Sequence, residues 1–240
     1  MFGIPGSFKI TNKINSFFRK DKKNNKNYKI FIALPYTLLQ SFSKIYRKSK
    51  IGISAQNCFH EDNFGAYTGS ISPFMIKKLG VKNIIIGHSE NRLTGDNDKV
   101  IKKKLFLALK NNLNVIFCIG ENKLEKKQKK TMIVLKRQIS NAFKKNYNFK
   151  KIIFAYEPIW SIGTGKVPSK TELKANSSSL KKFIRKKFKI KNNPKLLYGG
   201  SVDSKSIKEF KSINELDGFL IGGASKSAKN FIDIIKNYYR

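Results

Sequence analysis

Eight short apolar segments recur along the chain, separated by longer segments of mostly helical character. They are rich in Ile, Val, Phe and Leu without clean alternation, which is typical of strands buried on both faces of a parallel sheet. The eight predicted strands are Phe2–Ile10, Tyr28–Leu34, Ile51–Gln56, Asn83–Gly87, Asn114–Ile119, Lys151–Tyr156, Lys195–Tyr198 and Gly218–Ile221.

The segments between these strands show helical periodicity. Asp98–Asn111 places Val100, Ile101, Leu105 and Ala108 at three- and four-residue steps. Similar patterns are found in Ser72–Leu79, Thr131–Phe143 and Leu173–Lys187. Eight strand–helix units in 240 residues predict an α/β protein with a single (β/α)8 barrel domain over residues 1–240. A doubly wound sheet fits less well, and no linker or composition break indicates a second domain.

Residues with distinctive chemistry lie at the carboxyl ends of five of the predicted strands. They are Lys9, His88, Glu157, Gly199–Ser201 and Gly222–Gly223. In a (β/α)8 barrel the carboxyl ends of all strands meet at one rim, where catalytic residues gather. The sequence therefore predicts a site at this rim.

Glu157 directly follows a strand and precedes Pro158 and a glycine-rich segment, Ile162–Gly165. A carboxylate at the end of an apolar strand is partly desolvated, which raises its pKa and suits it to act as a base near neutral pH. The segment after it is typical of a mobile lid. The alternative for Glu157 alone is an ordinary surface carboxylate.

His88 lies between a predicted strand and the start of a helix at Ser89–Asn91. The positive end of the helix dipole favours the neutral ring, which can donate a hydrogen bond to a carbonyl oxygen. The alternative is a core histidine satisfied by a neighbour. The second histidine, His60, lies in a polar loop and is given no role.

Positive charge and backbone N–H groups at the same rim favour a phosphorylated substrate. Lys9 ends the predicted first strand, where it would stabilise a phosphate and a developing oxyanion. Gly199–Gly200 and Gly222–Gly223 expose backbone N–H groups after the last two strands, and Gly163 adds a third group from the lid. The alternative for each glycine pair is a tight turn.

The composition adds a formal net charge of +35. Such a charge is typical of nucleic-acid or anionic-surface binders. Lys and Asn are, however, scattered along the whole chain, which favours compositional drift and no specific nucleic-acid partner. The first ten residues lack a signal-peptide pattern, no apolar run approaches a membrane span, and Cys58 and Cys118 lack metal spacing. We therefore expect a cytoplasmic protein with reduced thiols and no membrane association.

Seven blocks of the sequence closely resemble the triosephosphate isomerase family, in an order and spacing that fit it over nearly the whole chain. The blocks are AQN at Ala55–Asn57, GAYTGSIS at Gly65–Ser72, IIGHSENR at Ile85–Arg92, CIGE at Cys118–Glu121, AYEPIWSIGTGK at Ala155–Lys166, YGGSV at Tyr198–Val202 and DGFLIGGAS at Asp217–Ser225. The resemblance implies a TIM barrel.

The resemblance implies interconversion of dihydroxyacetone phosphate and glyceraldehyde 3-phosphate, a reaction of glycolysis, gluconeogenesis and the pentose shunt. Glu157 would move the proton through an enediolate, His88 would polarise the carbonyl, and Lys9 would stabilise negative charge. Glu90 would be an acidic residue near Lys9 and His88. A Glu base, a neutral His and a closing loop are a known combination in this family.

The resemblance also implies how the substrate is held. The phosphate would be bound by Gly163, Ser201, Gly222 and Gly223. No metal ion or organic cofactor is implied, because the proton moves between adjacent carbons. The loop Gly65–Ser72 would form the interface of a homodimer, although it could also be a surface turn.

Two residues depart from the family pattern. Ser7 replaces the Asn that normally precedes the Lys and donates to the substrate carbonyl region. Pro168 stands in the C-terminal hinge of the lid, where its fixed φ and missing N–H would bias lid motion. Ser7 motivates an alternative function, a phosphate-binding barrel homologue with weakened catalysis.

Overall fold

The computed structural model describes residues 6–239, in which seven strands form one sheet with every neighbouring pair parallel. The strands are β1 (Phe31–Leu34), β2 (Gly52–Ala55), β3 (Asn83–Ile86), β4 (Asn114–Ile119), β5 (Ile152–Tyr156), β6 (Lys195–Tyr198) and β7 (Gly218–Phe219). They follow one another in chain order across the sheet. Their carboxyl ends therefore point toward the same rim.

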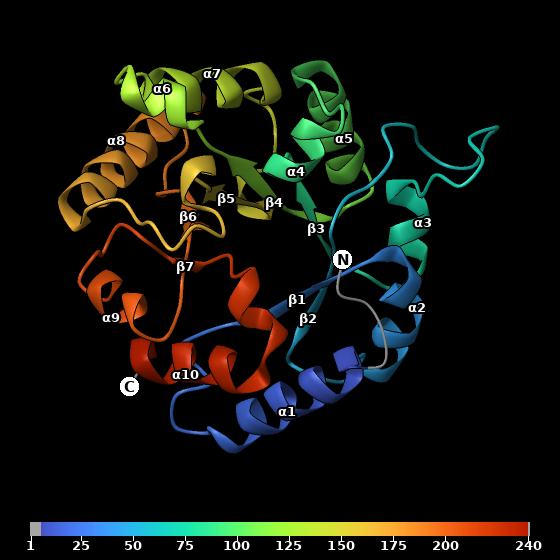
Figure 1. The fold of residues 1–240 in the computed structure, drawn as a ribbon. Helices are drawn as coiled ribbons and strands as arrows, with labels where there is room; N and C mark the ends of the chain where they lie inside the picture. The colour runs from blue at the N-terminus through green and yellow to red at the C-terminus, as the bar shows by residue number, and fades with distance from the viewer. Residues whose placement is uncertain (1–5, 240) are drawn as a thin grey trace.

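The helices form an outer layer around the strands (Figure 1). They are α1 (Gly6–Lys20), α2 (Tyr36–Ile45), α3 (Pro73–Lys78), α4 (Ser89–Leu93), α5 (Asp98–Lys110), α6 (Lys123–Lys127), α7 (Thr131–Ala142), α8 (Lys170–Phe188), α9 (Ser206–Phe210) and α10 (Ala228–Tyr239). Three 3-10 helices are η1 (Phe149–Lys151), η2 (Ile159–Ser161) and η3 (Gly223–Lys226). This architecture confirms the predicted TIM barrel. None of the helices in residues 6–239 is long and apolar enough to cross a membrane.

Seven of the eight predicted strands coincide with β1 to β7. The clearest case is β3, whose sequence Asn-Ile-Ile-Ile is buried at every position. The predicted helices Ser72–Leu79, Asp98–Asn111, Thr131–Phe143 and Leu173–Lys187 likewise coincide with α3, α5, α7 and α8.

The prediction of a first strand over Phe2–Ile10 is wrong for Gly6–Ile10, which forms the start of α1. Phe2–Pro5 lies outside the described residues. The apolar positions Ile10, Ile14 and Phe18 recur every four residues, and Ile14 and Phe18 pack against Ile235 of α10 in one buried cluster. A short apolar window cannot distinguish a strand from a helix, whereas the longer window has helical periodicity.

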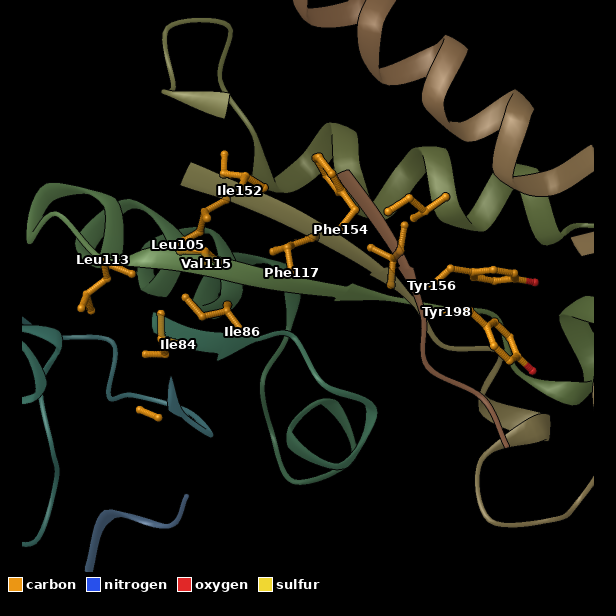
Figure 2. Packing of buried hydrophobic residues seen from close by; sticks show 14 of the residues in the cluster. Ile84, Ile86, Leu105, Leu113, Val115, Phe117, Ile152, Phe154, Tyr156 and Tyr198 are labelled. Atoms are coloured by element: carbon orange, nitrogen blue, oxygen red, sulfur yellow. The ribbon is translucent and has the colours of Figure 1, made fainter. Parts of the chain in front are cut away.

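The strands divide the core into two parts because successive side chains point to opposite faces. Along β4, Val115 and Phe117 face outward into the main cluster between sheet and helices, as Figure 2 shows. Ile116 and Cys118 face inward into a smaller cluster. The inward-facing side chains thus fill the interior of the barrel next to the rim.

Candidate functional site

Glu157 and His88 meet at the rim formed by the carboxyl ends of β3 and β5. Glu157 directly follows β5, and His88 lies two residues after β3. Nε2 of His88 is 3.3 Å from Oε1 of Glu157. Glu157 is only 3% exposed, whereas the His88 side chain is 24% exposed. The pair therefore combines a buried carboxylate with an imidazole that a small molecule can reach.

The backbone of α4 fixes the tautomer of His88. His88 is the N-cap of α4, and its Nδ1 accepts a hydrogen bond of 3.3 Å from the backbone N–H of Glu90. A neutral imidazole with Nδ1 as acceptor holds its proton on Nε2. The Nε2–H group therefore faces the Glu157 carboxylate and is a donor for a substrate oxygen that enters between them. The side chain of Glu90 is exposed.

Burial raises the pKa of Glu157 above its ordinary value. His88, a hydrogen bond with Cys118 and the charge of Arg92 act in the opposite direction but do not offset the burial. Arg92 is held in place by hydrogen bonds to the carbonyl oxygens of Gly87, at 2.8 Å, and Cys118, at 3.2 Å. The carboxylate is therefore more basic than an exposed glutamate, as a proton-abstracting group requires.

Two glycines let other strand ends approach Glu157 closely. A Cβ atom at Gly120 would overlap the carbonyl oxygen of Glu157, and one at Gly199 would lie 2.7 Å from its Cγ. Gln138 of α7 holds the Gly120 peptide through two hydrogen bonds of 3.0 Å. Sequence reasoning missed Gln138, because one amide on an amphipathic helix has no local signal that separates it from a surface residue.

The segment Pro158–Pro168, which we call the lid, follows Glu157 and is anchored at its start by Glu121. Nε1 of Trp160 donates to Oε1 of Glu121 at 2.8 Å, and the hydroxyl of Tyr156 donates to the same oxygen at 3.2 Å. Burial raises the pKa of Glu121. From sequence, the block Cys118–Glu121 shows only a family resemblance, which does not predict this anchoring contact.

The tip of the lid is exposed and lies against the loop after β6. Gly163 and Gly165 have φ of +69° and +74°, a conformation that favours glycine. The backbone N–H of Gly165 donates to Oγ of Ser201 at 3.1 Å. The structure therefore brings the predicted phosphate-binding residue Ser201 into contact with the lid.

Gly222 and Gly223 follow β7, as predicted, and are exposed. A Cβ atom at either position would meet nothing within 4 Å, and the same holds for Gly163. Packing within residues 6–239 thus does not explain why Gly222 and Gly223 are glycine, whereas Gly163 has a φ of +69°. The open, exposed backbone at these positions leaves room for a bound anion beside it.

Lys9 and Ser7 do not lie at the end of a strand, contrary to the sequence prediction, because both lie in the first turns of α1. Lys9 is exposed, and its neighbour Phe8 stacks on Phe42 of α2 with ring centroids 4.2 Å apart. The structure thus brings together His88, Glu157 and Gly199 and places Ser201 against the lid, whereas Lys9 and Ser7 lie on α1. Arg92 is a basic side chain whose charge, after that of His88, lowers the pKa of Glu157 against the effect of burial.

Comparisons with known proteins relate the chain to one family. The family model described as triosephosphate isomerase matches residues 6–238. The chain is 42% identical to the triosephosphate isomerase of Mycoplasma mobile, over 95% of this chain and 89% of that protein. It is 39% identical to that of Thermodesulfovibrio yellowstonii, over 86% of this chain and 85% of that protein.

A solved structure supports the same relation. The crystal structure of triosephosphate isomerase from Bartonella henselae superposes with a TM-score of 0.88 at 30% sequence identity, covering 100% of this chain and 96% of that chain.

Proposed function

The chain belongs to the triosephosphate isomerase family and interconverts dihydroxyacetone phosphate and D-glyceraldehyde 3-phosphate, and we propose that Glu157 and His88 carry out the proton transfer. The observation that carries this assignment is the 3.3 Å contact between Nε2 of His88 and the buried carboxylate of Glu157. The comparisons support an active isomerase rather than a phosphate-binding homologue with weakened catalysis.

In the proposed mechanism the Glu157 carboxylate takes a proton from the carbon next to the substrate carbonyl. The raised pKa of Glu157 supports this role, because a stronger base removes a carbon-bound proton more readily. The Nε2–H of His88 donates to the carbonyl oxygen as it becomes an enediolate oxygen and then moves a proton between the two oxygens. Glu157 returns its proton to the adjacent carbon. Glu90 supports His88 through its backbone N–H.

The phosphate group is proposed to lie between the lid and the loops after β6 and β7. Gly163, Ser201, Gly222 and Gly223 would supply hydrogen-bond donors there. The open space around the three glycines and the contact between Ser201 and Gly165 support this placement. The lid, Pro158–Pro168, would close over the phosphate and keep water from the enediolate.

A coupled assay that starts from glyceraldehyde 3-phosphate tests the proposed function on the purified protein. Formation of dihydroxyacetone phosphate is the expected result. A protein that binds glycerol 3-phosphate but does not form product would contradict the isomerase assignment.

Lys9 is proposed to supply positive charge to the reaction, and Ser7 to donate to the substrate. The family match that begins at residue 6 and includes both positions supports both roles. Replacing Lys9 by Met is expected to lower kcat/KM about a hundredfold, the usual cost of one electrostatic group in a site. Lys13→Met, on the same helix, is the matched control. An unchanged kcat/KM for Lys9→Met would remove Lys9 from the site.

The protein is proposed to form a homodimer through the loop Gly65–Ser72. Tyr67 in this loop and the adjacent Phe64 are 47% and 76% exposed, which supports an apolar contact surface. A cavity of about 210 Å³ beneath the loop is lined by Phe59, Phe64, Tyr67 and Met75 among others. Light scattering is expected to give twice the chain mass of 27.5 kDa, and the mass of a single chain at micromolar concentration would exclude the dimer.

The cytoplasm is the proposed location. The cysteines Cys58 and Cys118 are both buried free thiols, which supports a reducing compartment.

A further inference from the structure

Ser161 is a buried hydroxyl residue in a lid whose tip is exposed. It ends η2 and is 0% exposed, whereas Gly163, Thr164, Gly165 and Lys166 are all exposed. It takes no part in the proposed substrate contacts or proton transfer. Its hydrogen bonds indicate a different role.

The Ser161 hydroxyl uses its whole hydrogen-bonding capacity. Its Oγ donates to the carbonyl oxygen of Lys166 at 2.5 Å and accepts from the backbone N–H of Ser201 at 3.3 Å. The hydroxyl of Tyr198 lies 3.0 Å away and must be the donor in that pair, since the one proton of Ser161 is directed at Lys166. One hydroxyl thus joins both ends of the lid to the end of β6 and the loop after it.

The backbone of Ser161 adds a second connection to the same loop. Its carbonyl oxygen accepts a 2.6 Å hydrogen bond from Oγ of Ser201, and that Oγ in turn accepts from the N–H of Gly165. Gly200 completes the close packing, because a Cβ atom there would lie 2.5 Å from Oγ of Ser161. Pro168, at the far end of the lid, has no N–H to donate, so Lys166 provides the connection at that end.

We propose that Ser161 is the positioning residue that holds the lid against the loop after β6, and so sets how long the lid stays closed over the phosphate. This role rests on the proposed function of Pro158–Pro168 as a lid. Ser161 acts through Ser201 and Gly165, so it changes how the enediolate is protected while Glu157 and His88 keep their geometry. Removing its hydroxyl deprives Tyr198, Ser201 and Lys166 of a shared partner.

The chemical consequence is loss of phosphate from the intermediate. In an open site the electrons of the enediolate form a double bond to the carbon that bears the phosphate, and the carbon–oxygen bond to phosphate breaks. The remaining enol becomes methylglyoxal by proton transfer, so one triose phosphate gives methylglyoxal and inorganic phosphate without an oxidant or reductant. Phosphate released per isomerisation therefore measures how well the lid excludes this reaction.

The test compares Ser161→Ala with Ser177→Ala in the full-length protein. Ser177 in α8 is also 0% exposed, and its Oγ has no hydrogen-bond partner within residues 6–239, so its variant removes a buried hydroxyl without touching the lid. For Ser161→Ala we expect about tenfold more phosphate per isomerisation and about tenfold lower kcat/KM, as loss of one shared hydrogen-bonding group predicts. The acid limb of the pH profile, which reports Glu157, should not move.

Tyr198→Phe is a second variant, which removes the hydroxyl that donates to Oγ of Ser161. It also tests the proposal if Ser161→Ala does not fold. Its effect on phosphate release should have the same sign, and the double variant should show less than the product of the two single effects. The inference would be overturned if Ser161→Ala and Tyr198→Phe released an amount of phosphate per isomerisation within about twofold of that of Ser177→Ala. Such a change is well below the roughly tenfold increase expected from loss of the hydrogen bond. Absence of isomerisation by the unaltered protein would instead contradict the proposed function.

Discussion

Replacing Glu157 by Gln is expected to lower kcat at least about a thousandfold, because the amide cannot accept the proton that the reaction moves. The variant keeps the size of the side chain and an oxygen near Nε2 of His88, which lies 3.3 Å from Oε1 of Glu157 in the parent structure. Binding of glycerol 3-phosphate should therefore change little. The coupled isomerase assay and a titration with that ligand measure the two quantities separately.

The matched control is Glu209→Gln, the same chemical change at an exposed position of α9. Its kcat should equal that of the unaltered protein. Glu157→Asp gives an intermediate, since the carboxylate is kept but withdrawn by one methylene, and kcat should fall about a hundredfold. Full activity of Glu157→Gln would move the base to another residue.

The same substitution is expected to leave the protein as stable as before or more stable at neutral pH. Burial raises the pKa of Glu157 in the folded state above its value in the unfolded chain. The folded protein therefore binds the proton of Glu157 more tightly than the unfolded chain does. Above the folded-state pKa, the ionised Glu157 carboxylate consequently lowers the free energy of unfolding. As the pH falls through that pKa, the parent protein regains stability relative to Glu157→Gln. Urea unfolding across this pH range measures the difference.

The fold was predictable from sequence wherever burial on both faces produced a continuous apolar run. Asn83–Ile86 and Asn114–Ile119 are such runs, and both form strands at the predicted positions. The strand prediction for Gly6–Ile10 is wrong because the apolar residues of this segment continue into Ile14 and Phe18, which complete the apolar face of a helix. A prediction from a short stretch of sequence thus fails where the spacing of apolar residues becomes clear only over a longer segment.

The site was predictable to the extent that it depends on strand ends. His88 and Glu157 lie far apart in sequence, yet a parallel barrel brings the ends of β3 and β5 to one rim, and the two side chains meet there. The contacts of Ser161 and Gln138 depend on how a loop and a helix pack against that rim. No spacing rule connects Ser161 to Tyr198 or Gln138 to Gly120, so only the structure reveals them.

Replacing His88 by Gln is expected to lower kcat/KM about three hundredfold, within the range found when one donor to a developing oxyanion is lost. The Nε2–H of His88 is held by the hydrogen bond that Nδ1 accepts from the N–H of Glu90, so the imidazole is preorganised toward Glu157. A glutamine side chain also offers an N–H group, but it has more rotatable bonds and cannot pass a proton between two oxygens. The loss should therefore fall mainly on kcat rather than on KM.

The chain offers a matched control because it has a second histidine, His60, in the segment between β2 and α3, whose ring lies tilted against that of Phe59 with centroids 4.3 Å apart. His60→Gln makes the same chemical change outside the proposed site and should keep kcat/KM within about twofold, as expected for a position without a role in the reaction. In His88→Gln the acid limb of the pH profile should persist, because that limb reports ionisation of Glu157, which still acts as the base. Equal kcat/KM for the two variants would show that neither imidazole takes part in the reaction. The substrate carbonyl would then need another hydrogen-bond donor. The next candidate is the side chain of Arg92, whose charge acts on Glu157.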